Sequence, residues 1–479
     1  MTASPWPDRP RRSRCRARAF PASAIAVTLL SLCAVPRAQD DPVITEARVR
    51  ELVSWIAADE RMGRDCPSPG LEATAVWLQE RFAAAGLQPP TPDQWRHRYT
   101  LPGQRLDSRK VQISVTIGSG ADQKKIALAG DADVRLLGAP AVASGSDDNA
   151  ALVRAADPRL RRSLGMGGGR RATLLEVPAD HPLWQACAGE REILSRRLRG
   201  SAPVFLVRAG ALPAAAPAGG DDDAPPACAL SWQGAESETV DVALVNVVGV
   251  LRGSTKPDEY VMVSAHYDHI GIVPPVAGDS ICNGADDDAS GTTAVVMLAE
   301  ALSKGAPPKR SIAFVAFSAE EKGLRGSRAF AENPPLPLAA IVADVNIEMI
   351  GRPNAEYERK AWITGSSYSD FATIAGPALA RAGIGLADPD MAVHYFEQSD
   401  NLSLAVKGVV AHSISAGALP LQPDYHQPSD EVAKLDIAHM TAVIRGLREV
   451  VVAFADRDER PAYNDAGKAH LERLQDRGR

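Results

Sequence analysis

Residues 260–271 read Tyr-Val-Met-Val-Ser-Ala-His-Tyr-Asp-His-Ile-Gly. It begins as an apolar run and then changes abruptly to polar residues at His266 and Asp268. A short apolar run of this kind is typical of a strand that is buried on both faces of a sheet. In open α/β sheets, functional side chains lie just beyond the carboxyl ends of the strands. The stretch therefore predicts a buried strand with a candidate site at its end.

Further apolar runs alternate with helical stretches along the chain. The runs that predict strands lie at 244–251, 311–317, 340–347 and 408–414, and the helical stretches lie at 46–90, 291–303, 371–382 and 437–454. Alternating strands and helices indicate a sheet whose faces are covered by helices. We therefore predict an α/β fold with a mostly parallel sheet flanked by helices.

The segment between residues 126 and 242 interrupts this pattern. It contains a glycine-rich stretch at 165–170, which lacks the order of a dinucleotide-binding fingerprint, and an Ala/Pro/Asp run at 211–227. Such compositions are typical of loops and solvated linkers. The predicted parts of the chain are the amino-terminal part of the main domain at 43–125, an inserted second domain at 126–242, the rest of the main domain at 243–456 and a polar tail at 457–479.

The first 38 residues are typical of a signal peptide. A cationic stretch from Arg9 to Arg18 precedes an apolar run at 22–35, which is too short to span a bilayer. Cleavage is expected after Ala38, and lipid attachment at Cys33 is not, because Leu32 occupies a position that requires a small residue. We expect export to the periplasm or the extracellular space, with no membrane span after cleavage. A disordered basic tail is the alternative.

Charge and cysteine content exclude two classes of function. Removal of residues 1–38 takes away seven arginines and one aspartate, which changes the formal net charge from −6 to −12. An acidic protein is not expected to bind the phosphate backbone of nucleic acids. The later cysteines form no Cys-x-x-Cys pair, so a thiolate metal site is not expected either. In an exported protein Cys187 and Cys228 can form a disulfide, a point that the sequence leaves open.

Potential metal ligands follow several of the predicted strands. They are His266 after 260–265, Glu320 and Glu321 after 311–317, Glu348 after 340–347, an acidic triplet at 286–288 before a helix, and His426 in a polar loop after the last strand. Separate loops are thus expected to converge on one edge of the sheet. Each signal by itself is more typical of a surface or structural residue than of a metal ligand. The combination predicts a metal site.

Imidazole and carboxylate groups are ligands that suit Zn²⁺. Two histidines and three carboxylates suffice for two zinc ions if one carboxylate bridges them, and paired ions activate a shared water. Asp268, two residues after His266, is placed to orient that ring. Glu320 is adjacent to the potential ligand Glu321 and is the expected general base.

Four ordered stretches resemble a known family. They are Ala-His-Tyr-Asp-His-Ile-Gly at 265–271, Asn-Gly-Ala-Asp-Asp-Asp-Ala-Ser-Gly at 283–291, Ser-Ala-Glu-Glu-Lys-Gly-Leu-Arg-Gly-Ser at 318–327 and Tyr-His-Gln-Pro-Ser-Asp at 425–430. They look like the secreted bacterial di-zinc aminopeptidases, in the superfamily shared with glutamate carboxypeptidase and glutaminyl cyclase. The resemblance covers 46–90 and 243–455. It implies the zinc exopeptidase fold, two zinc ions per chain, peptide substrates and a divergent protease-associated domain as the insertion.

The resemblance also implies a role for each residue of the site. The implied metal ligands are His266, Asp287, Glu321, Glu348 and His426. Asp287, the middle acid of the triplet, would bridge the two ions and precede a cis peptide bond. Glu320 would be the general base, and Tyr425 resembles a tyrosine that stabilises the tetrahedral oxyanion in some relatives.

Two positions depart from the family pattern. Glu348 stands where the family usually has aspartate, so an additional methylene has to be accommodated. Asn401 stands where the family often has histidine. That histidine is not a usual ligand, so we expect an altered pocket rather than a lost metal.

An aminopeptidase is the leading prediction, and other functions are possible on the same fold. A carboxypeptidase or dipeptidase would need a basic side chain, such as Arg325 or Arg352, to bind the carboxylate of its substrate. A glutaminyl cyclase uses one zinc, whereas this chain has ligands for two. A non-catalytic receptor-like ectodomain typically lacks ligands or the base, which are all present here. A serine hydrolase is not indicated, because no Gly-x-Ser-x-Gly elbow occurs. The sequence does not predict the oligomeric state.

Overall fold

The computed structural model describes residues 41–118, 122–138, 142–154, 171–194, 203–213, 227–387 and 390–477. The predicted signal peptide with Cys33 and the glycine-rich stretch at 165–170 lie outside the described residues, as does most of the Ala/Pro/Asp run. Among the described residues, no helix is both long enough and apolar enough to cross a membrane.

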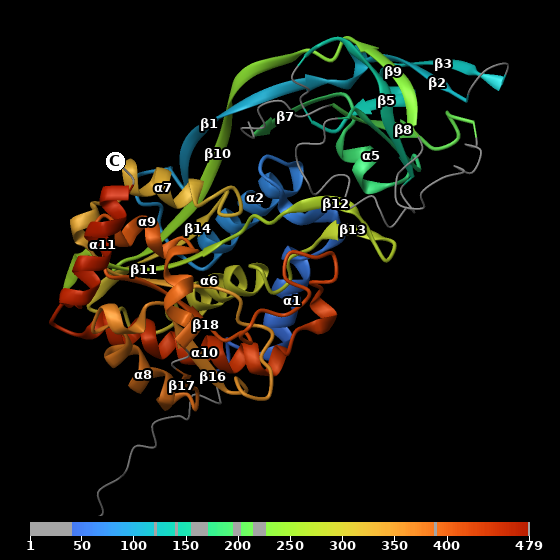
Figure 1. Cartoon of the computed structure of the whole chain (residues 1–479). Coiled ribbons are helices and arrows are strands. Elements are labelled where there is room, and N and C mark those ends of the chain that lie inside the picture. Colours follow the sequence, from blue (N-terminus) through green and yellow to red (C-terminus); the bar gives the residue numbers. More distant parts are fainter. Residues whose placement is uncertain are drawn as a thin grey trace, which may run out of the picture. The chain divides into compact units, whose positions relative to one another are not determined.

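A nine-stranded sheet forms the centre of the described structure, in the spatial order β17-β16-β18-β15-β11-β14-β10-β1-β7 (Figure 1). Its strands are β1 (Arg96–Asp107), β7 (Glu190–Leu194), β10 (Ser237–Leu251), β11 (Lys256–His266), β14 (Arg310–Phe317), β15 (Ile341–Ile347), β16 (Lys360–Ile363), β17 (Gly385–Ala387) and β18 (Ala411–Ser415). Each strand predicted from the sequence is present, and the predicted α/β fold is confirmed.

The sheet is mixed rather than purely parallel, and its parallel strands form the centre. Strands β14, β11, β15 and β18 are parallel to their neighbours in this group. The strands β10, β1 and β7 on one side are antiparallel, and so is β16 against β18 on the other. The cause on the first side is the insertion, because the chain leaves along β1 and returns beside it along β10 (Figure 1).

Helices cover both faces of the central strands, because every residue of β14 and β15 is buried. One set of helices, α1, α2, α6 and α10, packs together and contacts β10, β11 and β14, whereas α7 and α9 pack together and contact β10, β15 and β18. The helices are α1 (Glu46–Ile56), α2 (Pro69–Ala84), α6 (Ala289–Leu302), α7 (Arg325–Glu332), α8 (Phe371–Arg381), α9 (Asn401–Ala405), α10 (Ile437–Asp456) and α11 (Asp465–Arg477).

The insertion contains a second sheet with its own apolar core, in the order β3-β2-β9-β5-β6-β8-β4. Its strands are β2 (Gln112–Ile117), β3 (Lys124–Ala129), β4 (Val134–Leu136), β5 (Gly145–Arg154), β6 (Thr173–Val177), β8 (Val204–Arg208) and β9 (Ala227–Gln233), with the short helices α3 (Gly130–Asp133) and α5 (Pro182–Ala186). The second sheet begins at β2, so the predicted boundary at residue 126 lies too late. The change in composition marks the loops of the insertion and not its first strand.

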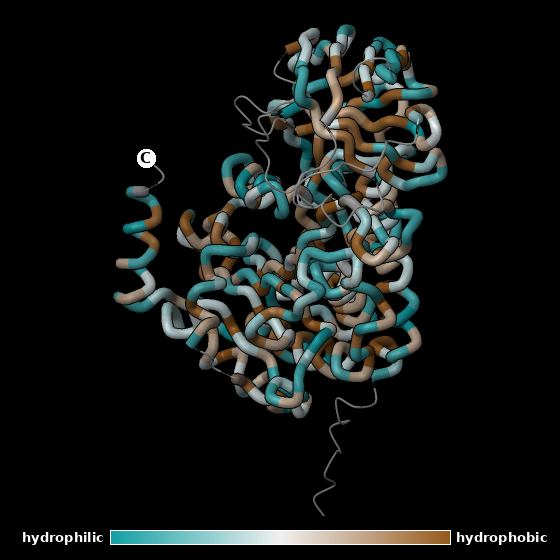
Figure 2. Tube along the Cα trace, turned by 45° about the vertical axis from the view of Figure 1, so that its right-hand side comes forward, coloured by the Kyte–Doolittle hydropathy of each residue, from teal (hydrophilic) through white to brown (hydrophobic). Residues whose placement is uncertain are grey.

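Two further expectations are resolved by packing. Cys187 and Cys228 are unpaired buried thiols that belong to different apolar clusters, so they do not form a disulfide. The predicted polar tail contains α11, which is mostly teal with isolated brown residues in Figure 2. One of its apolar side chains, Leu471, is 7% exposed and joins the main core. The tail is therefore a docked amphipathic helix.

A buried histidine stabilises the strand β18. His412 is 0% exposed, its Nδ1 lies 2.7 Å from the Thr364 carbonyl oxygen and its Nε2 lies 2.7 Å from the Ser369 hydroxyl. A neutral ring satisfies both contacts, with Nδ1–H as the donor and Nε2 as the acceptor. Burial lowers the pKa of His412 to about 4.

This shift predicts a pH-dependent stability. Because the unfolded chain takes up a proton near pH 6.5 and the folded chain does so near pH 4, stability is complete above pH 6.5 and declines as the pH falls towards 4. In His412→Gln, the loss of unfolding free energy between pH 7 and pH 5 should be smaller than in wild type by about 2 kcal/mol. Urea unfolding of both proteins at pH 7 and pH 5 measures these free energies of unfolding. Equal pH dependence in the two proteins would contradict the prediction.

Candidate metal centre

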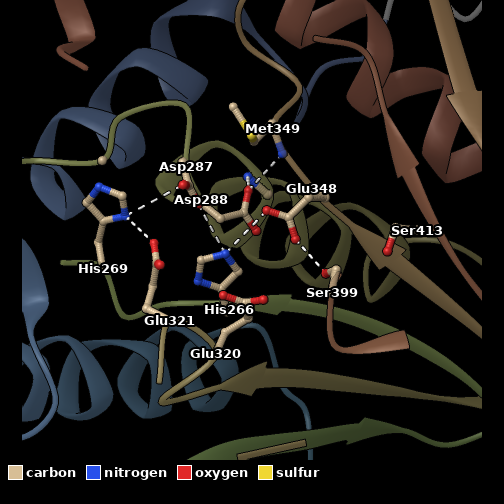
Figure 3. Close-up of polar contacts among 12 residues, drawn as sticks. His266, His269, Asp287, Asp288, Glu320, Glu321, Glu348, Met349, Ser399 and Ser413 are labelled. Carbon is tan, nitrogen blue, oxygen red and sulfur yellow. Dashed lines mark hydrogen bonds and ion pairs between the residues drawn. The ribbon is translucent and has the colours of Figure 1, made fainter. Parts of the chain in front are cut away.

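The structure brings the predicted metal ligands together at the carboxyl ends of the central strands. Figure 3 labels four of them, His266, Asp287, Glu321 and Glu348. His266 is the last residue of β11, Glu321 lies in the loop after β14, and Glu348 directly follows β15. Asp287 lies in the loop before α6, and His426 lies in the loop between β18 and the 3-10 helix η8 (Val432–Lys434). Because β14, β11 and β15 are adjacent and parallel, their carboxyl ends place these side chains at one edge of the sheet.

Three side chains form what we name the first donor group: His266, Asp287 and Glu348. His266 Nε2 lies 3.3 Å from Asp287 Oδ1 and 3.3 Å from Glu348 Oε1. Ligands about 2.0–2.1 Å from a tetrahedral zinc ion lie about 3.4 Å from one another. The spacing of the first donor group therefore fits one zinc ion.

The second donor group consists of His426, Asp287 and Glu321. His426 Nε2 lies 3.2 Å from Asp287 Oδ2 and 3.3 Å from Glu321 Oε2. The spacing again matches tetrahedral zinc, and Asp287 presents one carboxylate oxygen to each group. The geometry thus fits a pair of zinc ions with Asp287 between them.

A third histidine, which the sequence prediction did not include, lies against the second donor group. His269 is 0% exposed, and its Nδ1 lies 2.8 Å from Glu321 Oε1 and 3.8 Å from Asp287 Oδ2 (Figure 3). It follows β11 by three residues, in the same polar stretch as His266. Its position after β11 marks His269 as a candidate ligand. The sequence spacing does not indicate that its ring points towards the second donor group.

The other acids of the triplet bind the backbone. Asp286 Oδ1 accepts from the Gly351 amide at 2.7 Å, and Asp288 Oδ1 caps α6 by accepting from the Gly291 amide at 2.9 Å. Asp430 accepts from the amides of Asp286 and Asp287, each at 3.1 Å. The middle acid, Asp287, is thereby left to face the histidines. The Asp287–Asp288 peptide bond is cis, as the resemblance implied.

Asp268 supports the loop that carries Glu320 and Glu321. Its two carboxylate oxygens accept from the Glu320 amide at 3.0 Å and from the Glu321 amide at 3.3 Å. Its carboxylate lies 3.7 Å from His266 Nδ1, whereas its own carbonyl oxygen lies 3.1 Å from that nitrogen. The predicted orientation of the ring by Asp268 therefore involves its backbone, and its carboxylate mainly fixes the Glu320 loop.

Glu320 and Tyr425, the other predicted catalytic residues, also lie at this edge. The Glu320 side chain is half-buried beside His266 and belongs to neither donor group (Figure 3). Burial raises the pKa of Glu320 well above its ordinary value, and Asp400 and Glu348 add to the effect while His266 opposes it. Tyr425 is 37% exposed and stacks on His426 with ring centroids 3.7 Å apart. Tyr425 thus lies at the exposed rim of the site.

The field of the donor groups favours cations. Burial opposes ionisation of Asp287, but His269, His266 and His426 outweigh it and lower the pKa of Asp287. Likewise, burial lowers the pKa of His426, but Asp287 and Glu321 outweigh it and raise that pKa to about 10. A positive charge is therefore stabilised between these carboxylates, whether it is carried by a proton or by a metal ion.

Unsatisfied polar atoms point to the same conclusion. Asp287 Oδ2, Glu321 Oε1, His269 Nδ1 and His426 Nε2 are buried and have no hydrogen-bond partner among the described residues. Buried polar atoms of folded proteins are nearly always satisfied by a hydrogen bond, an ion or water. Orphaned donors that converge at zinc-like spacing fit bound metal.

The comparisons agree with this geometry. Residues 246–451 match Peptidase family M28. This part of the chain is similar to that family. The M28 region contains every predicted ligand, and the resemblance seen in the sequence is confirmed.

Known proteins match the chain to different extents. A probable zinc metalloprotease of Pyrenophora teres f. teres is 36% identical over 116 residues, which are 24% of either chain. Aminopeptidase YwaD of Bacillus subtilis is 24% identical over 192 residues, or 39% of either chain. A solved zinc aminopeptidase from Bacillus subtilis aligns with 87% of this chain and 97% of its own, with a TM-score of 0.54 and 15% identity. The curated relatives are thus matched over less than half of their length, and the solved structure shows a shared fold.

Asn401, the second departure from the family pattern, is not part of a pocket wall. It is 0% exposed, accepts from the Ser413 hydroxyl at 2.8 Å and donates to the Phe396 carbonyl oxygen at 3.1 Å. The expected altered pocket is therefore not seen at Asn401, because its side chain is used inside the protein.

Glu348 provides the test of the first donor group. Glu348→Ala removes one of three donors and should weaken binding of one zinc ion by at least about a hundredfold, while Glu348→Asp should retain more of the affinity. Competition with a chromophoric chelator measures both affinities, and metal analysis gives the stoichiometry. Glu356→Ala, at an exposed glutamate, is the control. Unchanged zinc binding by Glu348→Ala would show that Glu348 is not a ligand.

Proposed function

We propose that this protein is a zinc-dependent peptidase, and that it acts as an aminopeptidase that removes amino-terminal residues from peptides. The observation that carries the proposal is the pair of donor groups sharing Asp287, with the Glu320 carboxylate beside them and committed to neither. A site that only holds metal has no need of such an uncommitted carboxylate. The match to Peptidase family M28 supports the peptidase class, and the similarity to aminopeptidase YwaD supports the finer assignment.

Glu320 is suited to general-base catalysis. When bound, zinc ions lower the pKa of a water molecule and polarise the substrate carbonyl. Glu320 accepts the proton of the attacking water and then donates it to the departing amine. Its raised pKa makes the carboxylate a stronger base, which favours the first transfer.

Several side chains hold this machinery in position. Asp268 fixes the amides of Glu320 and Glu321, so it sets where both carboxylates point. Ser399 donates to Glu348 Oε2 at 2.6 Å, which leaves Oε1 for the first donor group (Figure 3). Tyr425, on the rim, has a phenol that can donate to the oxyanion of the tetrahedral intermediate.

The charges of the site support an aminopeptidase over a carboxypeptidase or dipeptidase. A carboxypeptidase needs a free basic side chain for the carboxylate of its substrate. Arg352 is paired with Asp424 at 2.8 Å, and Lys322 is paired with Asp65. Arg325 lies exposed on the surface, where its Nε donates to the Lys322 carbonyl oxygen. The carboxylates of the site, in contrast, favour the ammonium group of a free amino terminus.

Export is a further part of the proposal. It rests on the cationic and apolar segments of the first 38 residues and fits a peptidase that acts on peptides in the periplasm or outside the cell.

The substrate assignment predicts a requirement for a free amino terminus. Aminoacyl p-nitroanilides and unblocked peptides should be cleaved, while the N-acetylated forms of the same compounds should be cleaved at least about a hundredfold more slowly, since they lack the ammonium charge. Cleavage rates measured for each substrate and its N-acetylated form test this requirement. Faster cleavage of N-blocked peptides at their carboxyl ends would support the carboxypeptidase alternative instead.

The role of Glu320 separates an enzyme from a receptor-like protein. Glu320→Gln keeps the size and polarity of the side chain but removes its basicity, so kcat should fall by at least about a hundredfold. Zinc content should not change, because Glu320 is in neither donor group. Turnover and zinc are to be measured on the same preparation.

Two comparison variants sharpen this test. Glu321→Gln should lose zinc as well as activity, because Glu321 is a member of the second donor group. Glu356→Gln, at an exposed glutamate outside the site, should be as active as wild type. If Glu320→Gln were also fully active, Glu320 would have no role as a base, even with both metals present.

A further inference from the structure

His269 is not needed for either donor group, yet its position is fixed. Its amide donates to the Arg64 carbonyl oxygen at 3.2 Å. Gly284 lies against the ring, since a Cβ there would come within 2.5 Å of the His269 Cγ and Cδ2 atoms. Gly284 also has a φ of 55°, in the left-handed region where glycine is favoured. The chain thus leaves space for this imidazole and holds it there.

The contact between His269 and Glu321 is not a hydrogen bond. His269 Nδ1 and Glu321 Oε1 are 2.8 Å apart, yet neither atom has a hydrogen-bond partner. The lone pair or N–H of the ring nitrogen therefore does not point at the carboxylate oxygen. A buried nitrogen in such a place requires another partner. His269, Asp287 and Glu321 together are a group that can hold a metal ion.

We propose that His269 is an additional ligand of the zinc ion bound by the second donor group. The proposal rests on the metal site of the proposed function and goes beyond it, because it adds a donor from a fourth segment of the chain. Its Nδ1 lies 3.8 Å from Asp287 Oδ2, near the separation of about 3.4 Å expected between ligands of one tetrahedral ion.

This additional ligand makes the two ions unequal. The second ion would be held by four protein ligands, His269, His426, Asp287 and Glu321, as in the closed arrangement of structural zinc sites. The first ion would be held by three, as in catalytic zinc sites, and the Glu320 side chain lies beside His266 of that donor group. The second ion should therefore be bound more tightly, and a chelator should remove the first ion first.

The alternative is that His269 only positions Glu321. An asparagine at this position can place an amide donor near the site of Nδ1 and still support Glu321 Oε1, but its amide nitrogen cannot bind zinc. His269→Asn therefore distinguishes a ligand from a positioning residue, and His269→Ala removes both capacities.

The experiment uses the full chain loaded with zinc or cobalt. In wild type, titration against a chromophoric chelator should resolve two sites of unequal affinity. In both His269→Asn and His269→Ala, the tighter site should weaken by at least about tenfold, while the weaker site should keep its affinity. The visible absorption of the first equivalent of cobalt, which depends on coordination geometry, should change in both variants. His97→Asn, at a buried histidine hydrogen-bonded to Asn246 and Asn333, should behave as wild type.

Each other outcome has a defined meaning. Wild-type affinity and cobalt absorption in His269→Asn, with losses in His269→Ala, would overturn ligation in favour of positioning. Two ions bound with wild-type affinity by both variants would overturn any role of His269, and the proposed function would stand. A wild-type protein that binds fewer than two ions would overturn the proposed paired site, and this inference with it.

Discussion

The architecture of the site depends on burying acidic side chains at one edge of the sheet. Asp268, Asp286, Asp287, Asp288 and Asp430 are each at most 3% exposed. Removing a carboxylate from water is costly unless it gains a cation or hydrogen bonds. The structure supplies both. The Arg64 guanidinium, 0% exposed, lies in the field of these acids and donates to the carbonyl oxygens at 56, 267, 283 and 284.

The acids are divided into two kinds by what their oxygens face. Asp268, Asp286 and Asp430 accept from backbone amides, so their charge holds loops together. Asp287 and Glu321 face imidazoles and each keep an oxygen without a hydrogen-bond partner. The acids that accept from backbone amides fix the loops, and the acids that face imidazoles are available to bind cations. Metal binding should therefore stabilise the fold at the same place where it enables chemistry.

The sequence was most informative where local pattern and tertiary environment agree. Strands β14 and β15 are buried along their whole length, so continuous apolar runs predicted them and the ligands at their ends. Strand β1 was not predicted, because its pairing with β10 joins segments more than a hundred residues apart. The same limit applies to His269. Its position after β11 was visible, but the turn that brings it to Glu321 depends on Arg64, which is distant in sequence, and on the space left by Gly284 in another loop.

The two departures from the family pattern are connected through one hydrogen-bonded network. Glu348 accepts from Ser399, and Ser399 accepts from the Asn346 amide at 2.8 Å. Asn346 also donates to Ser413 at 2.8 Å, and Ser413 donates to Asn401. Because the Asn346 amide nitrogen only donates and each hydroxyl has a single proton, Ser399 donates to Glu348 and Ser413 donates to Asn401. The longer carboxylate of Glu348 is therefore oriented by Ser399, and position 401 belongs to the same network through β15 and β18 without contacting Glu348.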